Sequence, residues 1–242
     1  MTDRTSETHF IGPMGSEFWQ IRVPPKIVPI MADRFDWNKL GRRVVIDPIA
    51  GIISWINPSG PHVGLAEATV DIVKEASQFL NGQVRGMRDM RWRLPDDPKN
   101  TGVEADASFY IAANAERWYT AMAQGWETVA DFETRTPPDL VVEVEITHLD
   151  ENKPTRYAEL GVQEMWQTTR HQNQDQRQGE DRYKIEVVVL DLQARGGPRE
   201  VVQSRILPGL TAASLPQAYK LALNGRSKEL QNLLGKELVA PS

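Results

Sequence analysis

The amino-acid sequence predicts a single domain of the α/β class, and three observations lead to this class. An amphipathic segment over residues 61–82 has the apolar spacing of a helix and precedes most of the predicted strands. Short runs such as 103–112 and 139–146 alternate apolar and polar residues, as half-buried strands do. Helical spacing then returns over residues 215–238. This order of helices and strands is typical of α/β or α+β domains, in which helices cover a central sheet.

The composition is that of an ordinary globular protein, with 40% hydrophobic and 25% charged residues in a chain of 242. No apolar run approaches the roughly 20 residues that a membrane helix needs. The N-terminus lacks the basic-then-apolar order of a secretory signal. The chain has no cysteine, which excludes disulfides and thiolate metal sites. We therefore expect a cytoplasmic protein of the bacterial type that has no membrane partner.

The first part of the chain is expected to hold an arm, a hairpin and a helix. Residues 1–20 are expected to form a flexible N-terminal arm. Residues 44–46 and 52–56 are predicted strands on either side of a Pro/Gly turn. Gly82 is the expected stop of the helix that follows. The apolar residues of this helix recur at helical spacing, and they are Ala66, Val70, Val73, Ala76 and Leu80.

The rest of the chain mixes strands with helices. The predicted strands are residues 83–94, 103–112, 139–146, 163–169, 183–192 and 198–207. The predicted helices are residues 113–133, 154–162, 215–223 and 227–238. Because no linker or internal repeat is visible between residues 40 and 220, we expect one domain over residues 21–220 and a helical tail over 221–242.

The net charge of −5 gives no general sign of nucleic-acid binding, so contacts with phosphates would need a local basic patch. One candidate lies in the strand over residues 83–94, where arginines are interleaved with Met87, Met90 and Trp92. These arginines are Arg85, Arg88, Arg91 and Arg93. A solvated strand face is the simpler interpretation, and a grip on the backbone of DNA is the functional one.

The stretch TPPDLVVEVEITHLDENKPTRY, residues 136–157, places carboxylates inside an apolar strand. Alternate residues of a strand face opposite sides of the sheet, so Asp139, Glu143 and Glu145 share one face. Like charges in a row repel one another and favour protonation unless a positive charge lies between them. A divalent metal would supply that charge, and plain exposure to water would remove the need for it.

A second acidic strand, residues 103–112, carries Asp106. If this strand pairs with the strand of Glu143, the two carboxylates could converge on a site made of oxygen ligands. Such ligands suit Mg²⁺, which takes one or two carboxylates and keeps several waters. Phosphodiester hydrolysis is the chemistry that this kind of site performs best. Lys153 follows the carboxylate strand and could orient water or neutralise the charge that develops in the transition state.

Four segments follow one another along the chain: EADASFYI, PPDLVVEVEIT, KPTRYAELGVQEMW and SRILPGLTAASLPQAY. Upstream, residues 44–73 add a hairpin and a helix with His62 near its start. Over roughly residues 44–220 the chain thus resembles the Uma-type putative restriction endonuclease family of the PD-(D/E)XK nuclease superfamily. The resemblance implies a restriction-endonuclease-like α/β fold, with an N-terminal β-hairpin and a central mixed β-sheet flanked by helices. It also implies a metal-dependent endonuclease that acts on DNA and assembles as a homodimer.

Carried over position by position, the resemblance makes Asp106 and Glu143 metal ligands and the backbone carbonyl of Val144 a further ligand. Lys153 matches the catalytic lysine of the family, because it stands four residues before Tyr157. The implied cofactor is Mg²⁺ or Mn²⁺. Three more residues are additional candidates for this site: Glu145, Arg156 and Glu67.

Three departures from the family pattern favour a different function. Glu145 stands where the superfamily usually has its lysine. Pro154 disfavours a helical conformation for Lys153, so the ammonium is expected to fall short of the metal. The segment between Glu143 and Lys153 is also shorter than in the family. A catalytically inactive nuclease-fold module for binding or regulation would fit these departures, and an enzyme for a small phosphorylated substrate is a third candidate.

Overall fold

The computed structural model of the protein describes residues 6–11, 17–24, 26, 43–47, 51–57, 60–80, 82–92, 103–145, 152–172 and 183–239. The chain divides into two compact units. Unit 1 holds residues 1–63 and 96–101, and unit 2 holds residues 64–95 and 102–242. These boundaries do not coincide with those expected at residues 20 and 220, and the expected arm, domain and tail stay predictions.

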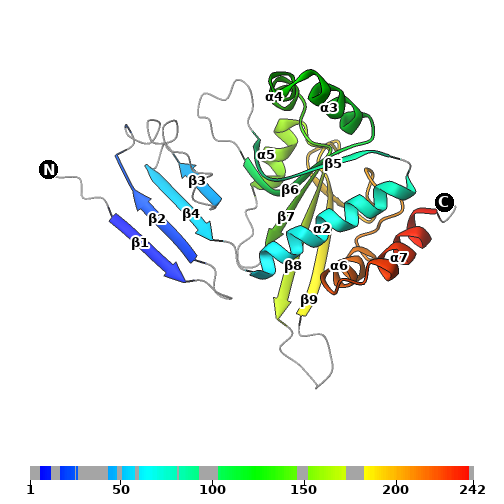
Figure 1. The fold of residues 1–242 in the computed structure, drawn as a ribbon. Helices are drawn as coiled ribbons and strands as arrows, with labels where there is room; N and C mark the ends of the chain where they lie inside the picture. The colour runs from blue at the N-terminus through cyan, green and yellow to red at the C-terminus, as the bar shows by residue number, and fades with distance from the viewer. Residues whose placement is uncertain are drawn as a thin grey trace. The chain divides into compact units, whose positions relative to one another are not determined.

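The strands of unit 1 form an antiparallel sheet in the order β1-β2-β4-β3 (Figure 1). They are β1 (Ser6–Ile11), β2 (Glu17–Arg22), β3 (Arg43–Asp47) and β4 (Ile52–Asn57). The predicted hairpin is confirmed, because β3 pairs with β4 and Val44 lies opposite Trp55. The sequence did not predict β1 or β2, whose residues lack a regular alternation, since strand formation depends strongly on the partners with which a segment pairs.

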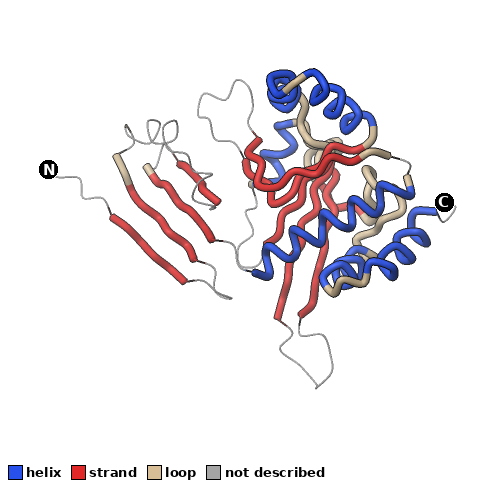
Figure 2. The backbone as a smooth tube through the Cα atoms, viewed as in Figure 1, coloured by secondary structure: helices blue, strands red, loops and turns tan. Residues whose placement is uncertain are grey.

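Unit 2 is built on a six-stranded sheet, which is drawn in red in Figure 2. Its strands are, in order across the sheet, β10 (Arg199–Val201), β9 (Tyr183–Asp191), β8 (Glu164–Gln172), β7 (Leu140–Glu145), β6 (Val103–Ile111) and β5 (Val84–Trp92). Strands β7 and β8 run parallel, and the other four neighbouring pairs are antiparallel. The sheet is therefore mixed, as predicted. The predicted strand over 198–207 shortens to β10, because residues 204–206 turn away to bond with Glu164.

Six described helices accompany the sheets. They are α2 (Gly60–Phe79), α3 (Ala113–Gln124), α4 (Trp126–Arg135), α5 (Lys153–Leu160), α6 (Leu215–Leu223) and α7 (Ser227–Val239). The single helix predicted over residues 113–133 is wrong. Gly125 adopts a φ of 122°, which L side chains rarely tolerate, and it separates α3 from α4. None of the described helices combines the length and the apolar character needed to cross a membrane.

Two clusters of buried apolar residues cover the two faces of the six-stranded sheet. The first cluster takes residues from α2, α6 and α7, and the second takes residues from α3, α4 and α5. Strand β7 shows the alternation: Leu140, Val142 and Val144 belong to the first cluster, and Val141 belongs to the second. The α/β class and the central sheet flanked by helices are thus confirmed. Because side chains alternate along a strand, Glu143 and Glu145 lie on the same face as Val141, toward α5.

Inside the first cluster, a buried tyrosine bridges two elements through hydroxyl groups. The Tyr219 hydroxyl on α6 lies 2.7 Å from Oγ1 of Thr69 on α2, and it accepts a hydrogen bond from Oγ1 of Thr168 on β8 at 3.0 Å. Burial raises the pKa of Tyr219 from its ordinary value of 10 to about 12, although both threonine contacts lower it in part. The folded chain therefore favours the neutral phenol.

This raised pKa predicts that stability falls in alkaline solution. Below pH 10 the phenol is neutral in both states, whereas between pH 10 and about 12 the unfolded chain releases this proton first. The contribution that is lost over this range is about 2–3 kcal/mol, at 1.36 kcal/mol for each unit of pKa. Urea unfolding at pH 9 and pH 11.5 measures the loss. Tyr219→Phe should show a shallower fall than the wild type, and equal falls would contradict the prediction.

Candidate metal centre

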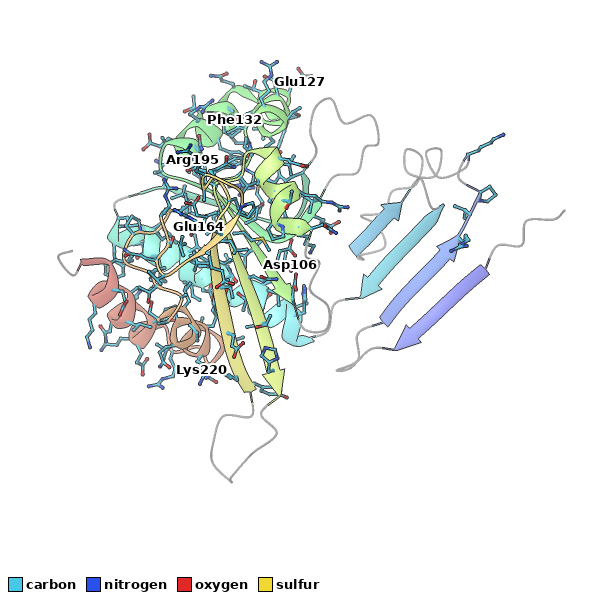
Figure 3. The ribbon with its side chains drawn as sticks, turned by 180° about the vertical axis from the view of Figure 1, so that it is seen from behind. Asp106, Glu127, Phe132, Glu164, Arg195 and Lys220 are labelled. Carbon is cyan, nitrogen blue, oxygen red and sulfur yellow. The ribbon has the colours of Figure 1, made fainter. Side chains whose placement is uncertain are left out.

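Strands β6 and β7 bring two acidic residues together at one place in the sheet. The two strands pair from Phe109 opposite Leu140 to Ala107 opposite Val142. One residue further along β6, Oδ2 of Asp106 accepts a hydrogen bond from the backbone N–H of Val144 at 2.7 Å. That N–H belongs to the peptide bond that joins Glu143 to Val144. The Asp106 carboxylate therefore lies against the backbone of Glu143, in the sheet of unit 2 (Figure 3).

The side chain of Glu143 is completely buried, and two groups from α5 contact its carboxylate. The Tyr157 hydroxyl donates a hydrogen bond to Oε1 at 2.5 Å. The Lys153 ammonium forms an ion pair with Oε2. A buried carboxylate is costly unless it is paired and hydrogen-bonded, and these contacts meet that requirement.

Helix α5 carries both Lys153 and Tyr157, and it follows β7 directly in the order of elements. Parallel strands need a crossover connection, and α5 lies in the connection between β7 and β8. Residues four apart lie on one side of a helix, so Lys153 and Tyr157 both face β7. The expectation that Pro154 would hold Lys153 outside the helix was wrong. Helix α5 begins at Lys153, and proline in a first turn is tolerated because its missing N–H would have no partner there.

Glu145 is the third acidic residue on this stretch of β7. It is 7% exposed and lies opposite Thr169 of β8 in the parallel register. As the alternation of β7 requires, it shares a face with Glu143 two residues earlier. The positive charge beside Glu143 comes from Lys153 on α5, whereas the strand position two residues after Glu143 holds Glu145.

The additional candidates lie at different places. Arg156 and Glu67 are exposed residues of α5 and α2. The side chain of Val144 is buried in the first cluster and has no donor atom, so a ligand from this residue would be its backbone carbonyl. These assignments stay predictions.

The sequence places Asp139 on the same strand face as Glu143. In the structure, the carboxylate of Asp139 is hydrogen-bonded to neighbouring elements of the fold. Its carboxylate accepts hydrogen bonds from the backbone N–H of Ile111, from Asn114 Nδ2 and from Gln163 Nε2, each at 2.7–2.8 Å. Burial raises the pKa of Asp139, and these three hydrogen bonds lower it in part. The residue thus joins the end of β6 to α3 and to the segment before β8.

The arginines predicted to contact DNA are on β5 or next to it. The Arg85 guanidinium stacks 4.1 Å from the ring centroid of Trp118 on α3. Arg85 therefore already has a partner within the protein. In the antiparallel backbone register, Arg88 lies opposite Ala107 and Arg91 lies opposite Glu104 of β6. Arg93 lies outside the described residues. The contact with DNA stays a prediction.

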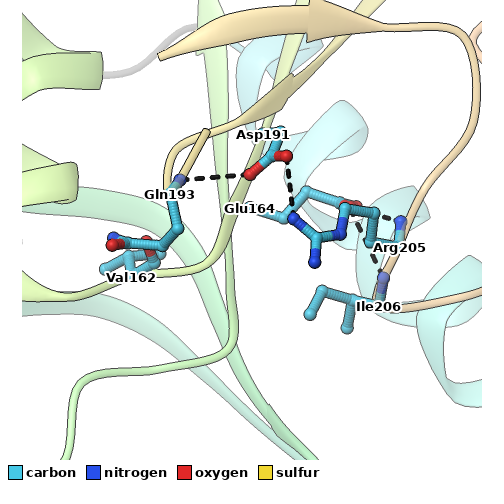
Figure 4. A network of polar contacts seen from close by, with 6 residues as sticks. All are labelled: Val162, Glu164, Asp191, Gln193, Arg205 and Ile206. Carbon is cyan, nitrogen blue, oxygen red and sulfur yellow. Dashed lines mark hydrogen bonds and ion pairs between the residues drawn. The ribbon is translucent and has the colours of Figure 1, made fainter. Parts of the chain in front are cut away.

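Another buried carboxylate, Glu164, is bonded within the fold, and Figure 4 shows its contacts with Arg205 and Ile206. At 1% exposure it accepts hydrogen bonds from Trp166 Nε1, Ser204 Oγ and the Arg205 N–H, each at 2.7 Å, and from the Ile206 N–H at 3.4 Å. Nearby, Arg205 Nη1 pairs with Asp191 at 2.8 Å. Glu164 stands in LGVQEMW and residues 204–206 in SRILPGL, so one carboxylate links two of the segments that carried the resemblance.

Asp106 and Glu143 carry carboxylate oxygens, the type of donor that hard divalent cations prefer. Among the residues that the structure describes, no group of three or more His, Cys, Asp and Glu side chains could hold a metal ion. Two carboxylates and a backbone carbonyl are nevertheless enough for Mg²⁺, which keeps several of its waters. The sequence did not assign a role to Tyr157, although its spacing of four residues from Lys153 already placed it on the same side of the helix.

A comparison with curated proteins finds no match. A family model described as "Uma2: Putative restriction endonuclease" matches residues 40–221, which include β6, β7 and α5. This match spans more than half of the chain. The protein therefore belongs to the Uma2 family of putative restriction endonucleases, within the PD-(D/E)XK superfamily.

Proposed function

We propose that the protein is a metal-dependent endonuclease that hydrolyses phosphodiester bonds in DNA at a centre formed by Asp106, Glu143 and Lys153. The observation that carries this proposal is a pair of contacts at β7: Asp106 of β6 bonds to the Val144 N–H, and Lys153 of α5 pairs with the Glu143 carboxylate. Membership of the family supports the nuclease class. The local geometry supports these residues, because Asp106 contacts the Glu143–Val144 peptide and Lys153 contacts the Glu143 carboxylate.

Asp106, Glu143 and the carbonyl of Val144 would hold one Mg²⁺ or Mn²⁺. Such an ion, when bound, polarises a phosphate oxygen and lowers the pKa of water. The Asp106 carboxylate is kept in place by the Val144 N–H, and the Glu143 carboxylate is kept in place by the Lys153 ammonium. Both ligands therefore have fixed orientations before substrate arrives.

Lys153 would stabilise the negative charge that develops on the phosphate. Its side chain is 15% exposed, whereas its partner Glu143 is completely buried, so the ammonium lies at the solvent side of the ion pair. A preorganised cation that faces developing negative charge is among the strongest means of catalysis that a protein has.

Arg88, Arg91 and Arg93 would contact the DNA backbone. A homodimer would cut both strands of the DNA.

A catalytically inactive nuclease-fold module is the second candidate, and Glu145 favours it. This carboxylate is nearly buried on the face of the site, where it adds negative charge instead of the lysine of the superfamily pattern. Such a module would keep the fold and could bind DNA or a partner without cutting it.

Plasmid cleavage separates the two candidates. Purified protein is incubated with supercoiled plasmid and Mn²⁺, with a chelator, and as the Asp106→Ala variant. We expect cutting by the wild type with Mn²⁺ alone, and early linear product would fit a homodimer. Cutting that survives the chelator or the loss of Asp106 would contradict the proposed centre. If the wild type binds Mn²⁺ in calorimetry and leaves the plasmid intact, the inactive module is favoured.

A further inference from the structure

Tyr157 contacts the Glu143 carboxylate from α5, and this contact has no part in the function proposed above. Its hydroxyl donates to Oε1 at 2.5 Å, and its side chain has no solvent exposure. The ring packs in the second core cluster, which also holds Val141 and Met165 from the strands beneath α5. A ring held in this way keeps its hydroxyl at one position.

The two donors from α5 act on different oxygens of the same carboxylate. Tyr157 contacts Oε1 and Lys153 contacts Oε2. Two donors from the same helix, α5, therefore fix the orientation of the carboxylate plane. The two donors differ in charge. The neutral hydroxyl orients the carboxylate and leaves its negative charge available, whereas the ammonium neutralises that charge and competes with any other cation for it.

We propose that Tyr157 is a positioning residue that orients Glu143 to receive a divalent cation. This inference rests on the function proposed above, because it assigns Glu143 as a ligand. Groups that hydrogen-bond to a metal ligand fix its orientation, and their loss typically weakens metal binding about 10- to 100-fold. A tyrosine that served only to fill the core would affect stability and leave the affinity for metal unchanged.

Calorimetric titration with Mn²⁺ tests the inference on the whole protein. Tyr157→Phe keeps the ring and removes only the oxygen, and we expect it to bind Mn²⁺ about 10- to 100-fold more weakly than the wild type. Lys153→Met removes the competing ammonium and should bind Mn²⁺ at least as tightly as the wild type. If Tyr157→Phe weakens Mn²⁺ binding and Lys153→Met does not, the role of Tyr157 in orienting the carboxylate is distinguished from the role of Lys153 in neutralising its charge.

Tyr110→Phe is the matched control. Tyr110 is also completely buried, and its hydroxyl donates to the backbone carbonyl of Thr136 at 2.6 Å, away from Glu143. Its loss should leave the affinity for Mn²⁺ unchanged within error. Equal affinity of Tyr157→Phe and the wild type would overturn the inference and leave the proposed centre intact. Absence of Mn²⁺ binding by the wild type would overturn both.

A second measurement does not require that Tyr157→Phe folds. The chain has five tyrosines, so wild-type protein labelled with fluorotyrosine gives few fluorine resonances. The Tyr157 resonance is assigned by removing the other tyrosines one at a time. Titration with Mg²⁺ should shift this resonance and leave that of Tyr219, on the other face of the sheet, in place. A Tyr157 resonance that stays in place while Mg²⁺ binds would contradict the inference.

Discussion

Glu143→Gln is expected to abolish metal-dependent cleavage while the protein still folds. The substitution keeps the size of the side chain and an oxygen that can accept from the Tyr157 hydroxyl, but it removes the negative charge. Lys153, the ionic partner, is partly exposed and can turn toward water. A metal ion contributes several kcal/mol of transition-state stabilisation, so losing a ligand should lower the cleavage rate about 10³-fold or more.

The two measurements are the initial rate of plasmid cutting and the affinity for Mn²⁺, both taken on samples whose circular dichroism matches that of the wild type. Glu145→Gln is the matched control, because it is the same substitution two residues along β7, also at a nearly buried carboxylate. We expect this control to keep metal binding. If Glu145→Gln loses Mn²⁺ and Glu143→Gln retains it, the centre has been assigned to the wrong carboxylate.

Much of this arrangement could be predicted from alternation along single strands. The period of two in LVVEVE predicted that Glu143 and Glu145 lie on one face of the strand and that Val142 and Val144 lie on the other. The two buried clusters confirm this alternation, because Val142 and Val144 belong to the first cluster and Val141 belongs to the second. The prediction that the strands of Asp106 and Glu143 are neighbours was also correct. The alternation is a local pattern that survives folding, because burial of one face fixes the register of a strand, whereas the pairing of the two strands was expected from their shared acidic residues.

Other features depend on contacts that no local pattern encodes. Pro154 suggested that Lys153 lies outside the helix, yet α5 begins at Lys153, and the ammonium of this residue pairs with Glu143 on β7. The break at Gly125 is visible in the sequence as one glycine inside a helical pattern, which is a weak signal. Glu164 gave no signal at all, since three of its four donors come from residues 204–206, about forty positions away.

Glu164→Ala is expected to produce the largest loss of stability among the substitutions considered. Four donors bond to this buried carboxylate, three of them at 2.7 Å. Each buried donor left without a partner costs about 1–3 kcal/mol, and breaking a buried charged network costs about 3–5 kcal/mol. We therefore expect the free energy of unfolding to fall by about 3–5 kcal/mol, against a typical total of 5–15 kcal/mol.

Urea unfolding measures this loss as a lower midpoint with an unchanged slope. Glu200→Ala, at an exposed glutamate on β10, is the control and should change stability by less than about 0.5 kcal/mol. The amide protons of Arg205 and Ile206 should exchange faster in Glu164→Ala, because both bond to the lost carboxylate. At a temperature where this variant is still folded, its affinity for Mn²⁺ should equal that of the wild type. Reduced affinity in the folded variant would mean that Glu164 acts on the centre at Asp106 and Glu143, and that its network is more than structural support.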